Sequence, residues 1–111
     1  MAEFSDRAWG SISEGDYADA GDFCAASLID LNPSGQEKSK ANCKLPVREP
    51  KAMGGRVNRN ALGAAAAALA GARGGVKAPT ADKRKAARSL IRLYGEGKME
   101  PPESLRRLAG G

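Results

Sequence analysis

The sequence predicts a small single α+β domain in which three or four helices pack with a short β-hairpin, preceded by an irregular N-terminal arm. The chain has 111 residues, a length that suits one modest hydrophobic core. Patterns typical of helices and of strands both occur, and glycine, proline and polar stretches separate them. We therefore expect an arm over residues 1–15 and one domain over residues 16–109.

The arm is predicted because its large side chains, Phe4, Trp9 and Ile12, stand isolated among serine and glycine. A helix is then expected over residues 17–28, where apolar residues recur at three- and four-residue spacing. The stripe consists of Tyr17, Ala20, Cys24 and Leu28, with Phe23 beside it. Residues 32–42 read as a polar loop.

A strand is predicted over residues 43–50, because Cys43, Leu45 and Val47 alternate with polar residues or proline. Pro46 lacks an amide hydrogen and favours the edge of a sheet. Residues 51–55 contain two adjacent glycines and suit a hairpin loop, with residues 56–58 as a short returning strand.

The alanine-rich segment that follows predicts a central packing helix over residues 61–72. Asn58 or Asn60 is expected to cap its start, and Gly74-Gly75 to end it. Its small side chains let a neighbouring element approach closely. The segment contains no glycine-rich phosphate-binding motif, so a ligand-binding loop is not expected here.

Two C-terminal helices complete the predicted fold. The first runs over about 80–94, with Thr80 as its cap, and Gly95 and Gly97 follow its end. Its core stripe consists of Ala87, Leu90, Ile91 and Tyr94. The second is a short helix over 103–109, docked by Leu105 and Leu108.

Charge is divided unevenly along the chain. Residues 1–35 hold seven acids against one arginine, a net charge of −6, whereas residues 36–111 hold 17 lysines and arginines against six acids, a net charge of +11. A basic stripe is expected on the outer side of the 80–94 helix: Arg84, Lys85, Arg88 and Arg92. Further cations are scattered over residues 38–59. Such a stripe suits a solvated helix face, an acidic protein surface or nucleic acid.

The residue inventory argues against an enzyme. The chain has no histidine, so a Ser-His-Asp or Cys-His arrangement is not available. Two cysteines, Cys24 and Cys43, do not complete a tetrahedral zinc site, and neither a metal nor another cofactor is expected. In a reducing compartment we expect both as free, partly buried thiols, and a disulfide as the alternative after exposure to air.

The chain is expected in the cytosol or packaged from it into an assembly. No apolar run approaches the roughly 20 residues of a membrane span. The first residues lack the basic and apolar regions of a secretory signal.

A resemblance in sequence motifs limits the range of functions that we expect. It is carried by Tyr17, Phe23-Cys24 and Leu28-Ile29, then by residues 44–50 (KLPVREP), 58–60 (NRN), the alanine-rich run 64–76 and residues 101–105 (PPESL). Together these motifs resemble a small domain that recurs in proteins of tailed bacteriophages and prophages, especially those of actinobacteria, alone or beside head-maturation protease or capsid-related proteins. The match spans about residues 9–105. Residues 25–27 depart from the pattern and put the register of the first helix in doubt. The resemblance implies a phage context and supplies no active-site residues.

The expected function is therefore a non-enzymatic virion structural protein, a capsid decoration or minor head protein, which stabilises the shell through protein–protein contacts. Its location would be the capsid of the virion, after assembly in the host cytoplasm. Its partners would be the major capsid protein or other virion proteins, with self-association open and no membrane contact. The candidate partner-binding residues lie on the strand edge and on the basic stripe: Lys44, Leu45, Val47, Arg48, Arg84, Lys85, Arg88 and Arg92. Two alternatives stay open: a nucleic-acid-binding accessory protein that uses the basic helix face, and an assembly factor for a maturation protease.

Overall fold

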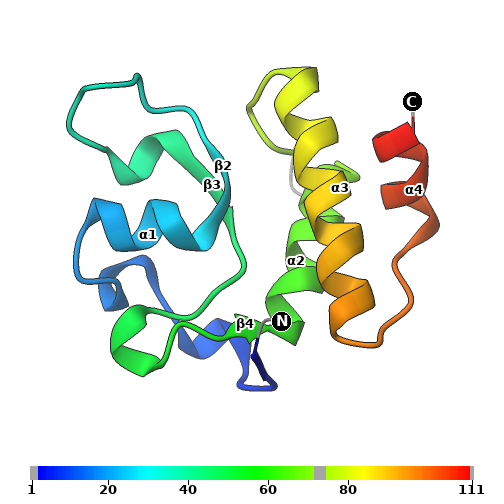
Figure 1. Ribbon diagram of the computed structural model, residues 1–111, viewed down its shortest axis with the longest axis horizontal. Coiled ribbons are helices and arrows are strands. Elements are labelled where there is room, and N and C mark those ends of the chain that lie inside the picture. Colours follow the sequence, from blue (N-terminus) through cyan, green and yellow to red (C-terminus); the bar gives the residue numbers. More distant parts are fainter. Residues whose placement is uncertain (1–2, 72–74, 111) are drawn as a thin grey trace.

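Two groups of elements lie side by side in the computed structural model, which describes residues 3–71 and 75–110 (Figure 1). The first group holds one helix and an antiparallel pair of strands: α1 (Ala20–Ala26), β2 (Ser27–Asp30) and β3 (Cys43–Pro46). The second holds three helices: α2 (Arg59–Leu69), α3 (Thr80–Glu96) and α4 (Glu103–Gly110). A second small sheet pairs β1 (Phe4–Ser5) in parallel with β4 (Val57–Asn58). The predicted small α+β domain with three or four helices is thus confirmed, and the described residues form four α-helices.

The first helix is shorter than predicted, and the strand that follows it was missed. Asp19 caps α1, because its side chain accepts a 2.8 Å hydrogen bond from the Asp22 amide. At the other end, the Ser27 hydroxyl donates to the Phe23 carbonyl oxygen, and Ser27 itself is extended. The chain therefore leaves the helix after Ala26. Residues 27–30 pair with β3, and Ile29 lies opposite Lys44.

The turn of the predicted hairpin over residues 43–58 is present, but its two arms pair only partly with each other. Lys51–Met53 form the 3₁₀ helix η4, and Gly54 and Gly55 follow in the left-handed region with φ of 107° and 64°. On either side of this turn, the Glu49 amide donates to Arg56 and the Asn58 amide donates to Val47, both at 2.8 Å. The partner of β3 is β2 and not the predicted returning strand, which pairs instead with β1.

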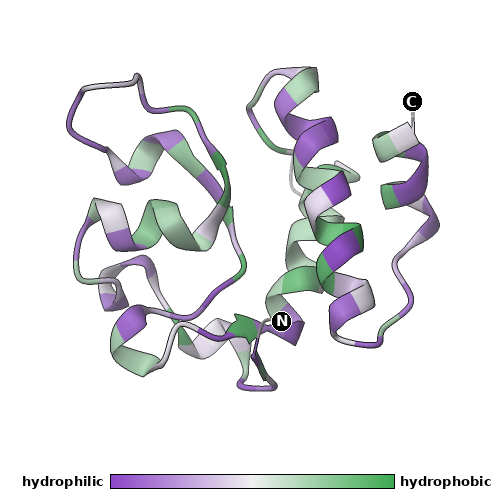
Figure 2. Cartoon of the chain, viewed as in Figure 1, coloured by the Kyte–Doolittle hydropathy of each residue, from purple (hydrophilic) through white to green (hydrophobic). Residues whose placement is uncertain are grey.

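The alanine helix begins at the cap that the sequence predicted. The Asn58 side chain accepts a 2.9 Å hydrogen bond from the Ala61 amide, whereas Asn60 lies in the first turn. α2 ends at Leu69, earlier than the expected residue 72, and Gly71 follows with a φ of 106°. The predicted terminating pair Gly74-Gly75 lies partly outside the described residues. In Figure 2 α2 is apolar along most of its length, in agreement with a central packing helix.

The two C-terminal helices pack against each other and against α2. Thr80 is not the cap of α3: Pro79 holds that position without a side-chain bond, and the helix continues through Gly95 to Glu96. Leu93 is buried and was not predicted, whereas Ile91 is only half-buried. Leu105 of α4 is fully buried, as expected of a docking residue.

Most of the buried apolar residues form two clusters. The helical cluster gathers side chains mainly of α2, α3 and α4: Val47, Val57, Ala61, Leu62, Ala65, Ala66, Ala87, Leu90, Leu93, Tyr94 and Leu105. The cysteine cluster lies around α1: Tyr17, Phe23, Cys24, Ala26 and Cys43. The expectation of free thiols was wrong, because Cys24 and Cys43 form a disulfide with their Cα atoms 5.3 Å apart. The pairing of β2 with β3 brings Cys43 beside α1, which explains the contact.

Candidate partner-binding surfaces

The basic stripe is a feature of the outer side of α3. Arg84, Lys85, Arg88 and Arg92 fall within about a third of the helix circumference, opposite the buried Leu90 and Leu93. Lys85, Arg88 and Arg92 are exposed, and Arg84 is half-buried. The structure therefore brings these predicted residues together on one helix, which packing against α2 and α4 fixes in place.

None of the ion pairs among residues 3–71 and 75–110 involves this stripe. The described pairs are Arg7–Glu49, Lys38–Asp30, Arg56–Glu3, Arg59–Asp6 and Arg106–Glu100. Within the same part of the chain, the Arg84 Nε atom is buried without a hydrogen-bond partner. Each pair of like charges spaced four residues apart destabilises a helix by about 0.2–0.5 kcal/mol. An anionic partner would offset this repulsion.

The acidic N-terminal arm is neutralised largely by its own chain. Glu3 lies 3.8 Å from Arg56, and Asp6 lies 3.0 Å from Arg59. The Arg59 guanidinium also sits 5.1 Å from the centre of the Phe4 ring, within the range of a cation–π contact. The charge of the arm is thus partly neutralised within the molecule, whereas no ion pair described for residues 3–71 and 75–110 reaches the stripe on α3.

The other predicted contact segment, residues 44–48, serves the fold more than the surface. Val47 is buried in the helical cluster, and its backbone is bonded on both sides, to Ala26 and to Asn58. Leu45 packs against the same cluster and holds a φ of 60°, which is uncommon for a residue other than glycine. This leaves little continuous strand edge for a partner.

Two polar groups of this segment also have partners within the fold. The Lys44 ammonium donates to the Ala41 carbonyl oxygen at 2.8 Å. The Arg48 carbonyl oxygen accepts a hydrogen bond of 2.5 Å from the Tyr17 hydroxyl. Burial, and to a smaller extent the nearby Asp22 charge, raises the pKa of Tyr17 to about 12. No described interaction links residues 44–48 to the stripe on α3.

Glu49 is a buried carboxylate that sequence patterns did not predict. It is 2% exposed, and burial disfavours its charge. Hydrogen bonds from Ser5 and Asn58 and the charges of Arg7 and Arg56 outweigh that effect and hold its pKa below the ordinary value. Asn58 also donates to the Arg7 carbonyl oxygen at 2.8 Å, so the pair ties the arm to the start of α2. The role of these residues is structural.

A small cavity lies next to this carboxylate. Its volume is about 100 Å³, and its lining includes Asp22, Ala26, Arg48, Glu49 and Lys51. Pockets that enclose small-molecule ligands measure roughly 300–1,000 Å³. The cavity is therefore too small to serve as a substrate site of ordinary size.

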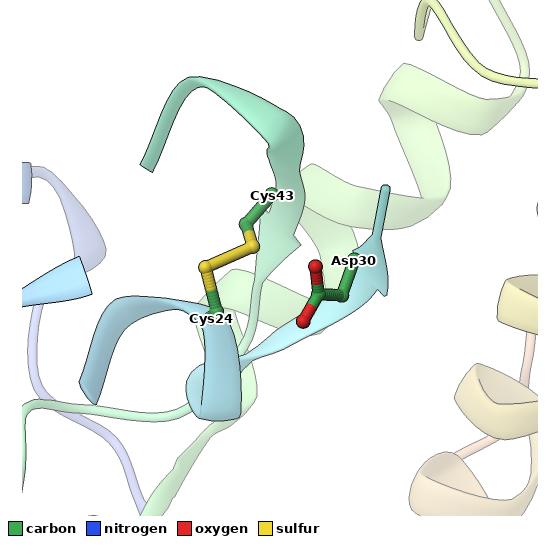
Figure 3. Close-up of side chains that lie close together, drawn as sticks. All are labelled: Cys24, Asp30 and Cys43. Carbon is green, nitrogen blue, oxygen red and sulfur yellow. A yellow bond between two sulfur atoms is a disulfide. The ribbon is translucent and has the colours of Figure 1, made fainter. Parts of the chain in front are cut away.

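A polar cluster surrounds the disulfide. Figure 3 shows the Asp30 carboxylate beside the two sulfur atoms, and one ligand atom from each of Cys24, Asp30 and Cys43 lies within 4.8 Å of the others. The Lys38 ammonium and hydrogen bonds from Asn32 lower the pKa of Asp30 to about 2. These are the described residues best placed to hold a metal ion. The sequence did not reveal them as a group, because β2 was not predicted.

Comparisons add no relative to this description. No known protein family matches the chain, and no match is found among curated proteins or among solved structures. Among the described residues, no helix combines the length and the apolar character that crossing a membrane would require.

Proposed function

We propose that the chain is a non-enzymatic structural protein of a bacteriophage particle, a capsid decoration or minor head protein that stabilises the shell through protein–protein contacts. The phage context rests on the resemblance carried by residues 44–50, 58–60, 64–76 and 101–105. The observation that carries the contact role is the stripe on α3, whose four cations stand outside the described ion pairs.

The partner of the stripe is an acidic protein surface of the particle. The acids at the start of the arm are bound to Arg56 and Arg59 of the same chain, so they are not the natural partners of the stripe in a neighbouring copy. The exposed acids that follow, Glu14, Asp16 and Asp19, would be the contact points if copies of the chain met one another. The major capsid protein or another virion protein is the leading partner.

Repetition makes such a contact sufficient. A solvent-exposed ion pair contributes roughly 0–1 kcal/mol, so one stripe alone binds weakly. Copies arranged on a symmetric lattice engage together, and their contacts add through avidity. The absence of histidine from the sequence is consistent with a binding role rather than catalysis.

The test is to ask whether the chain is present in purified particles. A gel and mass spectrometry of virions from the encoding phage or induced prophage should show the 11.5 kDa chain at high copy number. Proheads should be analysed in parallel, because an assembly factor for a maturation protease would appear in proheads and be missing from finished virions. Absence of the chain from both particles would rule out the proposal.

A charge-matched pair of variants tests the surface itself. Arg84→Gln, Arg88→Gln and Arg92→Gln together remove three charges from the stripe, and should reduce association with particles at least tenfold. Lys51→Gln, Lys77→Gln and Arg107→Gln remove three exposed charges elsewhere, and should leave association near the wild-type value. Equal losses in both variants would show that net charge, and not the stripe, governs binding.

A second candidate function is nucleic-acid binding, because the same four cations would suit a phosphodiester backbone. Mobility-shift titrations of duplex DNA and of single-stranded RNA at two salt concentrations separate the two classes. Binding that weakens steeply with salt and is lost in the stripe variant supports this alternative. Absence of binding at the lower salt concentration removes it.

A further inference from the structure

The Asn32 side-chain nitrogen lies at the centre of a group of acceptor atoms. Its Nδ2 atom is 3.5 Å from Cys24 Sγ, 3.2 Å from Cys43 Sγ, 2.8 Å from Asp30 Oδ1 and 3.3 Å from the Ser39 carbonyl oxygen. Both sulfurs belong to buried residues, whereas Asp30 is exposed and Asn32 half-buried. Two sulfurs and two oxygens, contributed by four residues between positions 24 and 43, thus face one small volume.

The orientation of this amide is fixed by its oxygen. Asn32 Oδ1 accepts a 2.8 Å hydrogen bond from the Ser39 backbone amide and another of 3.2 Å from Asn42. The NH₂ group must therefore point at the acceptors. It has two hydrogens for four acceptors. The Asp30 carboxylate also accepts from the Asn32 backbone amide and pairs with Lys38, so the remaining weak acceptors are the two sulfurs. A cation in the same place would interact with all of them.

We infer that, once the disulfide is reduced, the Cys24 and Cys43 thiolates and the Asp30 carboxylate bind a thiophilic divalent metal ion, with Zn²⁺ as the best fit. Thiolates select zinc over magnesium and calcium, and a carboxylate oxygen is an ordinary third ligand. Water completes the coordination. The sequence suggested no such site, because two cysteines alone do not make one, and the third donor emerges only from the pairing of β2 with β3.

Reduction of the disulfide requires one co-reactant, a dithiol. A cellular dithiol supplies two electrons and two protons, which break the S–S bond and give two protein thiols, while the dithiol becomes a disulfide. The metal ion then binds to the two sulfurs and displaces two protons into solvent. Oxidation by a disulfide of that same class reverses the sequence and releases the ion.

The geometry requires only small movements. Ligand atoms on one tetrahedral zinc ion lie about 3.3–3.8 Å apart, given bond lengths of about 2.0–2.3 Å. In the oxidised chain the three donor atoms are already within 4.8 Å of one another. Rotation of the two cysteine side chains separates the sulfurs, and the Asn32 amide gives up its place to the ion.

Such a site would meet a physical need of the cysteine cluster. The cluster has five buried residues, and small cores commonly rely on a cross-link or a bound metal ion. A disulfide does not persist in a reducing cytosol. The metal ion would close the same region there, and the disulfide would take over after exposure to oxidising surroundings. This inference is independent of the proposed phage function.

The test is Co²⁺ titration of two samples of the full chain under anaerobic conditions. One sample is reduced with a phosphine beforehand, and the other keeps its disulfide. The reduced chain should develop thiolate-to-cobalt charge transfer in the near ultraviolet and the visible bands of tetrahedral cobalt, at a stoichiometry of one ion per chain. Zn²⁺ should abolish both signals and raise the Tm of the reduced chain. The oxidised chain should give neither signal.

Two single variants then identify the third donor. Asp30→Asn should weaken cobalt affinity at least tenfold. Lys38→Gln removes the partner of Asp30 in the ion pair but keeps the carboxylate, and should bind cobalt at least as tightly as the wild type. Both variants retain the disulfide, so their fold can be verified in the oxidised form before reduction.

Three results would overturn the inference. The first is a reduced, soluble chain that gives no cobalt bands. The second is an unchanged cobalt affinity in Asp30→Asn, which would leave only the two sulfurs as protein ligands. The third is equal cobalt binding by the oxidised chain, which would place the ion elsewhere.

Discussion

The cysteine cluster packs two aromatic rings around a covalent link, whereas the helical cluster is larger and consists mostly of alanine, leucine and valine. Tyr17 and Phe23 meet edge to face with their ring centres 5.1 Å apart. α2 instead presents Ala61, Ala65 and Ala66, which let its neighbours approach closely. A small cluster of buried residues thus relies on bulky rings and a cross-link for its stability. The larger cluster relies on helices that pack closely through small side chains.

The largest effect is expected at the centre of the helical cluster. Leu90→Ala should lower the free energy of unfolding by about 2–5 kcal/mol, because Leu90 is fully buried and its removal leaves a cavity. The adjacent Ile91 is only half-buried, so Ile91→Ala should cost about 1 kcal/mol. Urea denaturation of both variants measures the difference. Equal costs would show that the packing of α3 differs from the arrangement described.

Removal of the cross-link should affect the cysteine cluster selectively. The link joins residues separated by 19 positions, and replacing both cysteines by serine should lower the free energy of unfolding by about 3 kcal/mol. Hydrogen exchange should show lost protection in α1, β2 and β3 and retained protection in α3. Uniform loss over the whole chain would instead mean that the two clusters unfold as one cooperative unit.

Alkaline pH should weaken the same cluster through Tyr17. Its pKa is about 12 in the folded chain, above the ordinary value of 10.0, so the unfolded chain loses the proton first as the pH rises. The contribution is fully present below pH 10 and is lost between pH 10 and 12, with about 1.4 kcal/mol gone at pH 11. Comparison of unfolding free energies of the wild type and Tyr17→Phe from pH 9 to 11 measures this slope.

The test is how steeply the free energy of unfolding falls with pH, and not its absolute value. Tyr17→Phe also removes the hydrogen bond to Arg48, which lowers stability at every pH. Burial raises the pKa of Tyr94 as well, but Tyr94 is present in both proteins and contributes equally to each. Parallel curves for the two proteins would contradict the burial of the Tyr17 hydroxyl.

Much of the helical cluster could be predicted from sequence, because its signals are local. The Asn58 cap, the alanine run and the spacing of Leu90 and Tyr94 each act within a few residues of one another. The same reasoning missed Leu93, whose burial depends on where α4 lies against α3. It also extended the first helix through Leu28, because the strand in which Leu28 lies is stabilised by pairing with residues far along the chain.

The candidate sites show the same division. The stripe on α3 follows from four-residue spacing, so its members were identified before the fold was known. The burial of Val47 in the core was not predicted, because alternation of apolar and polar residues does not tell which face of a short strand is covered. The acceptors around Asn32 come from residues 24–43, and only the β2–β3 pairing brings them together.

The smallest effect concerns the arm, which joins the helical cluster through Phe4. A Cβ atom added at Gly97 would lie 3.0 Å from one carbon of the Phe4 ring, so Gly97→Ala should displace the ring and lower stability by about 1 kcal/mol. Gly95 lies within α3 with nothing near its added Cβ, so Gly95→Ala should raise stability by about 0.5–1 kcal/mol through helix propensity. Thermal unfolding of the two variants gives opposite signs if the arm is packed as described. If both variants gain stability, Phe4 does not rest on Gly97, and the arm is held by its polar contacts with Arg56, Arg59 and Asn58 alone.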